Sequence, residues 1–191
     1  MFIEFEETPN PNTLKFMPGY TVMEDGVRDY KTVEDAIYSP LARAVFVLDG
    51  VNGVFLGSDF VSVTKDAIQD WDLLKPRVMA VVMEHFSSGQ AILSEPESVK
   101  AQGGSTSNDL LDEISKQIVE LLDQRVKPAV AMDGGNIEFV SFDDGIVYLR
   151  LEGACAGCPS STVTLKMGIE NMLKHYVPEI IRVEAVNPFD Y

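Results

Sequence analysis

Cys155 and Cys158 are the only two cysteines of the chain, and two residues separate them in the segment GACAGCPSS, residues 153–161. In a reducing compartment, a Cys-x-x-Cys pair binds a metal or cycles between dithiol and disulfide more often than it forms a structural disulfide. A disulfide here would close a very short loop and would stabilise the fold little. The pair therefore predicts a metal-binding or redox site.

The two thiols are expected at the start of a helix, because a strand-like segment ends just before them and Pro159 follows at the favoured first helical position. Free backbone N–H groups and the positive end of the helix dipole stabilise a thiolate there. We therefore expect the pKa of the thiols to fall from about 8.5 towards neutrality. The loop after the carboxyl end of a strand is also where open α/β sheets bind ligands.

A complete metal site needs more donors than this pair provides, since a zinc site or an iron–sulfur cluster takes about four protein ligands. His85 lies in the other half of the chain, and His175 lies about 25 Å from Cys158 along the same helix at 1.5 Å per residue. We therefore hypothesise that two chains meet about a twofold axis and that each contributes Cys155 and Cys158 to one cofactor. Thiolates of another protein could displace such ligands, which suits a carrier.

The pair by itself leaves three alternatives open. A thioredoxin-like dithiol oxidoreductase also places Cys-x-x-Cys at a helix start. A dimeric interaction module stapled by zinc would use the same four thiols. The thiols could also be buried for packing alone, because a two-residue spacing is an unspecific signal.

The elements around the pair follow a regular order. An apolar stripe at i, i+3 and i+4 spacing over residues 110–122 predicts an amphipathic helix. Residues 136–154 show strand patterning on both sides of Asp144-Gly145, a strong hairpin signal. A second helix has one apolar face over residues 165–176, and residues 180–186 read as a third strand. The prediction is an α-β-β-α-β domain with a three-stranded mixed sheet.

The first half of the chain also alternates between strands and helices. Residues 2–7 and 13–18 predict a hairpin, and residues 53–66 predict two further strands. Residues 39–50 and 71–89 predict two helices, the second of which ends at a glycine. This half contains no cysteine and no constellation of catalytic groups.

A segment rich in serine, with one proline and a glycine pair, separates the halves at residues 94–107 and predicts a flexible linker. The expected fold class is thus α/β (α+β) with two small domains, residues 1–93 and residues 108–191.

The composition excludes some partners and suggests a compartment. The net charge is -15, so nucleic acid and anionic membrane surfaces are repelled by the chain as a whole. The first ten residues contain no basic region and no Arg-rich presequence, and no apolar run approaches the roughly 20 residues of a membrane span. We expect a protein of the bacterial cytoplasm.

Two segments of the second half, VKPAVAMDGGNIEF (residues 126–139) and GACAGCPSSTVTLKMGIENMLKHYVPEI (residues 153–180), closely resemble the NifU-like C-terminal domain of Nfu-type iron–sulfur scaffold proteins. This resemblance covers about residues 108–186. The segment EETPNPNTLKFMPG (residues 6–19) is similar to the N-terminal domain that accompanies it in this family.

The resemblance implies a homodimer that binds one 4Fe-4S cluster through Cys155 and Cys158 of each chain. It implies a scaffold or carrier, not an enzyme, which receives the cluster from an upstream donor and delivers it to apo-proteins. Gly134 and Gly135 match the glycine-rich turn of the family, and we interpret both as positions that need a positive φ.

Overall fold

The computed structural model describes residues 3–94, 113–156 and 159–186. Its internal contacts divide the chain into two compact units, Met1–Gly103 and Gly104–Tyr191, and each is described by itself. The expected linker lies outside the described residues except for Ser94, as does the beginning of the helix expected from residue 110. The domain boundaries named above therefore stay predictions.

The first unit is built on a five-stranded antiparallel sheet with the strand order β1-β2-β5-β4-β3. Its strands are β1 (Glu4–Glu7), β2 (Thr13–Met17), β3 (Arg28–Tyr30), β4 (Val51–Leu56) and β5 (Val61–Lys65). The β1-β2 hairpin and the strands β4 and β5 confirm the sequence-based expectation. Strand β3 was not foreseen, because its three residues are too few to show an alternating pattern.

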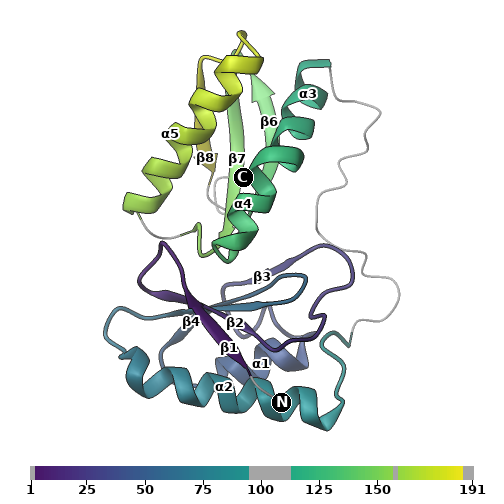
Figure 1. Cartoon of the computed structure of the whole chain (residues 1–191), viewed down its shortest axis with the longest axis vertical. Helices are drawn as coiled ribbons and strands as arrows, with labels where there is room; N and C mark the ends of the chain where they lie inside the picture. The colour runs from purple at the N-terminus through teal and green to yellow at the C-terminus, as the bar shows by residue number, and fades with distance from the viewer. Residues whose placement is uncertain (1–2, 95–112, 157–158, 187–191) are drawn as a thin grey trace. The chain divides into compact units, whose positions relative to one another are not determined.

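Two helices, α1 (Pro40–Phe46) and α2 (Trp71–Ser88), lie on one face of this sheet (Figure 1). The hydroxyl oxygen of Ser39 caps α1 by accepting the N–H of Ala42 at 3.2 Å. Helix α2 ends at Gly89, which has a φ of 67° and takes the left-handed conformation that favours glycine. One apolar core fills the space between the helices and the sheet.

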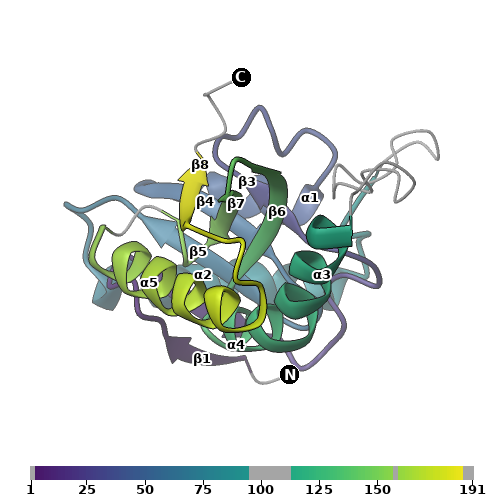
Figure 2. The same cartoon turned by 90° about the horizontal axis from the view of Figure 1, so that it is seen from above.

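The second unit has the predicted three-stranded mixed sheet and the predicted order α-β-β-α-β, except that its first helical part continues beyond the predicted residues 110–122 to Met132. Its elements are α3 (Glu113–Leu121), the π-helical turn η1 (Leu122–Val126), α4 (Lys127–Met132), β6 (Gly135–Asp143), β7 (Ile146–Gly153), α5 (Pro159–Tyr176) and β8 (Arg182–Val186). The strand order is β6-β7-β8, in which β6 pairs with β7 antiparallel and β7 pairs with β8 parallel. The helices lie together on one face of this sheet (Figure 2), with an apolar core between them.

The turn and the crossover of the second unit explain where its candidate site lies. Asp144 and Gly145 connect β6 to β7 with φ values of 46° and 79°, which are typical of a type I′ hairpin turn. A parallel pair such as β7 and β8 needs a long crossover, which α5 provides. The loop between β7 and α5 therefore leaves the carboxyl end of the central strand.

Within the described residues, no helix combines the length and the apolar character needed to cross a bilayer.

Candidate metal centre

Cys155 lies in the short loop between Gly153, the last residue of β7, and Pro159, the first residue of α5. This is the position expected from the sequence. Cys158 lies outside the described residues, so its place beside Cys155 stays a prediction. The loop follows the middle strand of the sheet, at the edge where α/β proteins bind ligands.

Hydrogen bonds tie the adjacent residues Ala154 and Cys155 to different elements. The N–H of Ala154 donates to the carbonyl oxygen of Gly134, just before β6, at 3.2 Å. The hydroxyl of Thr162, in the first turn of α5, donates to the carbonyl oxygen of Cys155 at 3.3 Å. The backbone of Cys155 is therefore held between the start of β6 and the start of α5.

The Cys155 side chain is part of the apolar core of the second unit and is only 7% exposed. This burial, together with the negative charge of Asp133, raises the pKa of the Cys155 thiol to about 12. The expectation that the helix start lowers the pKa of this thiol is therefore wrong for Cys155. The physical reason is that the thiolate loses its hydration in the core, and this loss outweighs the field of the helix end.

A raised thiol pKa favours one of the candidate chemistries over another. Attack on a disulfide requires a thiolate, and a buried cysteine with a raised pKa is inert as a nucleophile. A metal cation reverses the balance, because its charge deprotonates a thiol that coordinates it. The thiolate of Cys155 is also the type of donor that iron–sulfur clusters use. Cys155 therefore fits a metal-bound cluster better than it fits a redox nucleophile.

Within residues 3–94, 113–156 and 159–186, no three His, Cys, Asp or Glu side chains come together in a way that could hold a metal ion. His85 is buried in α2 of the first unit, where its Nε2 atom has no hydrogen-bond partner and burial lowers its pKa. His175 lies in the last turn of α5, at the opposite end of that helix from the thiol loop, and packs edge-on against Tyr176. Within the second unit, His175 is therefore not brought together with Cys155.

Exposed apolar side chains lie on the two helices that adjoin the thiol loop. Met132, the last residue of α4, is 75% exposed. Val163 and Met167, in the first half of α5, are 56% and 60% exposed. Covering apolar side chains that are this exposed with another protein surface would remove them from water and so stabilise the contact.

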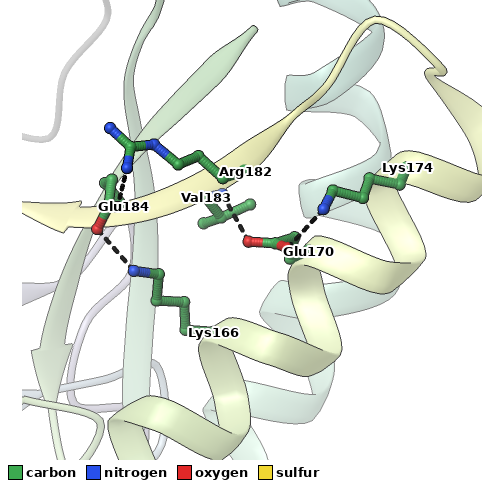
Figure 3. Close-up of polar contacts among 6 residues, drawn as sticks. All are labelled: Lys166, Glu170, Lys174, Arg182, Val183 and Glu184. Carbon is green, nitrogen blue, oxygen red and sulfur yellow. Dashed lines mark hydrogen bonds and ion pairs between the residues drawn. The ribbon is translucent and has the colours of Figure 1, made fainter.

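Charged side chains fix the middle and second half of α5 against β8 (Figure 3). The carboxylate of Glu170 accepts the backbone N–H of Val183 at 3.0 Å and pairs with Lys174 at 2.6 Å. Lys166 pairs with Glu184 of β8 at 2.6 Å. The hydrogen bonds from Lys174 and Val183 lower the pKa of Glu170. Sequence reasoning missed the contacts of α5 with β8, because they join residues 13 and 18 positions apart. Only Glu170 and Lys174 lie at the local i, i+4 spacing.

Two family models match the chain. Residues 3–89 match the model described as "Scaffold protein Nfu/NifU N terminal". Residues 118–184 match the model described as "NifU-like domain". The two matches together cover most of both units.

Curated proteins from plants and animals are similar over nearly the whole chain. "NifU-like protein 4, mitochondrial" from Arabidopsis thaliana is 50% identical over 96% of this chain and 65% of that protein. "NFU1 iron-sulfur cluster scaffold homolog, mitochondrial" from Homo sapiens is 48% identical over 97% of this chain and 72% of that protein. The chain thus spans about two thirds of the length of such relatives.

A solved structure overlaps with half of the chain. The solution NMR structure of a NifU-like protein from Saccharomyces cerevisiae covers 50% of this chain and 87% of its own, with 24% identity and a TM-score of 0.46.

The names of the curated relatives contradict the expectation of a bacterial cytoplasmic location, because they describe mitochondrial proteins. That expectation rested on the character of the first ten residues of the printed sequence. Those residues are no guide to targeting when the related proteins extend beyond the matched stretch.

Proposed function

The chain belongs to the Nfu-type family of iron–sulfur cluster scaffold proteins, and on this premise we propose that two copies of it hold one 4Fe-4S cluster between them. Cys155 and Cys158 of each copy supply the four thiolate ligands. The observation that carries this proposal is the donor inventory around Cys155. The chain has two cysteines, and its described residues bring no histidine or group of carboxylates to complete a site.

The second copy solves two problems of the single chain. A cluster takes about four protein ligands, and a twofold axis doubles the available thiols from two to four. The same contact would cover the exposed apolar side chains of Met132, Val163 and Met167 on the helices next to the loop. Both features support a homodimer that forms around the cluster.

A cluster at a boundary between copies suits transfer to another protein. Each copy holds half of the ligands, so thiolates of an apo-protein can replace them one at a time. The cluster is cargo in this function, supplied by an upstream donor and delivered to client apo-proteins. We propose that the chain is a carrier and not an enzyme, because a family model that it matches and its human relative are named as scaffold proteins.

Anaerobic reconstitution with iron and sulfide tests this function directly. The expected product absorbs in the visible range, contains about two iron atoms per chain and elutes as a dimer. Cys155→Ser and Cys158→Ser are the matched controls, and each is expected to prevent this product. Binding of zinc alone would support the stapled interaction module, and a titratable disulfide without metal would support the oxidoreductase.

A further inference from the structure

Gly134 precedes β6 and Gly135 is its first residue. The structure requires a glycine at each of these positions, but for different reasons. Gly134 has a φ of 78°, so a residue with a side chain would be strained there, as the sequence suggested. Gly135 is not among the described glycines with a positive φ. The interpretation that Gly135 needs a positive φ is therefore wrong, and its lack of a side chain needs another explanation.

That explanation lies in the space above Gly135, which the thiol loop occupies. Gly135 pairs directly with Gly153 at the end of β7, two residues before Cys155. A methyl group built on Gly135 would lie 2.6 Å from the Sγ atom of Cys155, 2.7 Å from the carbonyl oxygen of Glu152 and 3.0 Å from the backbone nitrogen of Cys155. The distances to the sulfur and to the carbonyl oxygen are shorter than real contacts of a Cβ atom, and the distance to the backbone nitrogen is at the lower limit of such contacts.

We infer that Gly135 is a positioning residue for Cys155: its missing side chain lets the thiol and its loop settle against the start of β6. This inference rests on the proposed function only where it concerns the cluster. The contact between Gly135 and Cys155 is a property of the chain by itself.

A methyl group at Gly135 cannot be accommodated by rotating the Cys155 side chain alone. Two of the three close atoms belong to the backbone of Glu152 and Cys155. The end of β7 at Glu152 and the loop that carries Cys155 must therefore move away from the start of β6, and the sulfur moves with them. A ligand must be held to within about 0.5 Å of its productive position, so a shift of this size is expected to impair cluster binding.

The first experiment measures the alkylation rate of Cys155 in the full chain, with Cys158→Ser as the background so that one thiol reacts. Iodoacetamide is expected to modify the buried thiol slowly. Gly135→Ala is expected to raise this rate by about tenfold, because displaced sulfur becomes accessible. Gly168→Ala is the matched control, since it adds the same methyl group to the same unit at a position with nothing within 4 Å. An equal rate in Gly135→Ala and in the background protein would contradict the inference.

The second experiment is a double-mutant cycle on the unfolding temperature of the full chain without cluster. Gly135→Ala is expected to lower this temperature by about 5–15 °C, the range for an overpacked site in a small domain. In the Cys155→Ala background, the loss caused by Gly135→Ala is expected to shrink but not to vanish, because the contact with the sulfur is removed while the contacts with the backbone of Glu152 and Cys155 remain. Additive losses would show that Gly135 serves the backbone alone and would overturn the inference. If Gly135→Ala does not fold, recovery of folding in the double variant supports the inference, and failure to recover contradicts it.

The third experiment separates this inference from the proposed function. Reconstitution of Gly135→Ala with iron and sulfide is expected to yield less cluster per chain than Gly168→Ala. If the unsubstituted chain itself takes up no cluster, the proposed function fails, while the alkylation rate and the cycle still decide the role of Gly135.

Discussion

Among the described residues, each of the two units buries one histidine or cysteine side chain, and the two side chains lie in different kinds of element. His85 is 4% exposed and lies within helix α2 of the first unit. Cys155 is 7% exposed and lies in a loop between β7 and α5 of the second unit. Burial shifts both pKa values towards the neutral form, downwards for His85 and upwards for Cys155. Burial and a shifted pKa therefore do not by themselves mark a functional residue.

The helix that contains His85 and the loop that contains Cys155 allow these two side chains different movements. His85 is fixed by helical hydrogen bonds and packs among the apolar residues of a helix face, so exposing it would require part of α2 to unfold. Cys155 is held by a strand end, a glycine contact and a hydroxyl from α5. For the proposed function, a loop of this kind can bring its thiol to a cofactor while the sheet stays intact. This difference supports the second unit as the site of cluster chemistry.

The largest expected effect is the loss of the cluster from the cysteine variants. Cys155→Ser and Cys158→Ser should reduce iron uptake on reconstitution to background, because each removes two of about four ligands from a twofold site. Circular dichroism should show the fold retained. His85→Leu is the control from the other unit and should leave iron uptake unchanged. Loss of iron uptake in His85→Leu would contradict the conclusion that only the second unit binds the cluster.

Exposed apolar residues in the two units should also differ in their effect on the dimer. Met167→Glu adds a charge to the exposed face of α5 and is expected to weaken the cluster-bound dimer by about tenfold, a difference of about 1.4 kcal/mol. Ile68→Glu makes the same change at a residue of the first unit that is 93% exposed. Sedimentation equilibrium of the reconstituted proteins measures both. Equal weakening by the two substitutions would show that α5 has no special part in the contact.

The pH dependence of the free energy of unfolding should reflect the protonation of His85. The lowered pKa means that the unfolded chain binds a proton more readily than the folded chain as the pH falls through 6.5, so stability is lost on acidification. His85→Leu removes this loss, and it also removes an Nε2 atom that has no hydrogen-bond partner. We expect its free energy of unfolding to exceed that of the unsubstituted chain by about 1 kcal/mol at pH 7, and by more at pH 5. Urea titrations at the two pH values measure this, and a constant difference would contradict it.

The smallest expected effect concerns the attachment of α5 to β8. The lowered pKa of Glu170 stabilises the folded state above the unfolded value of 4.5, and this contribution is lost as the pH falls through the folded pKa. Glu170→Gln should therefore lower the free energy of unfolding by about 0.5–1 kcal/mol at pH 7 and by nothing measurable at pH 2. Chemical denaturation at both pH values checks this. An undiminished difference at pH 2 would point to a packing effect instead of a charge effect.

The sequence predicts those parts of the fold that depend on local patterns. The hairpin at Asp144-Gly145, the helix end at Gly89, and the order of elements around Cys155 are all confirmed. Strand β3 was missed because it is short and its pairing with β4 is set by tertiary structure.

The site was predicted less completely, because its properties depend on burial. The position of Cys155 at a strand end followed from local pattern, but the direction of its pKa shift was wrong. A helix-end effect is visible in sequence, whereas the depth of a thiol in a core is not. The role of Gly135 was missed for the same reason, since its contact joins residues 20 positions apart across the β6-β7 pair.

Native mass spectrometry of the anaerobically reconstituted full chain tests the central claim most directly, because it counts protein copies and inorganic atoms in the same ion. We predict a species that contains two chains and about four iron and four sulfide atoms, with no single chain that carries the complete set. A single chain that retains a complete cluster would contradict the account.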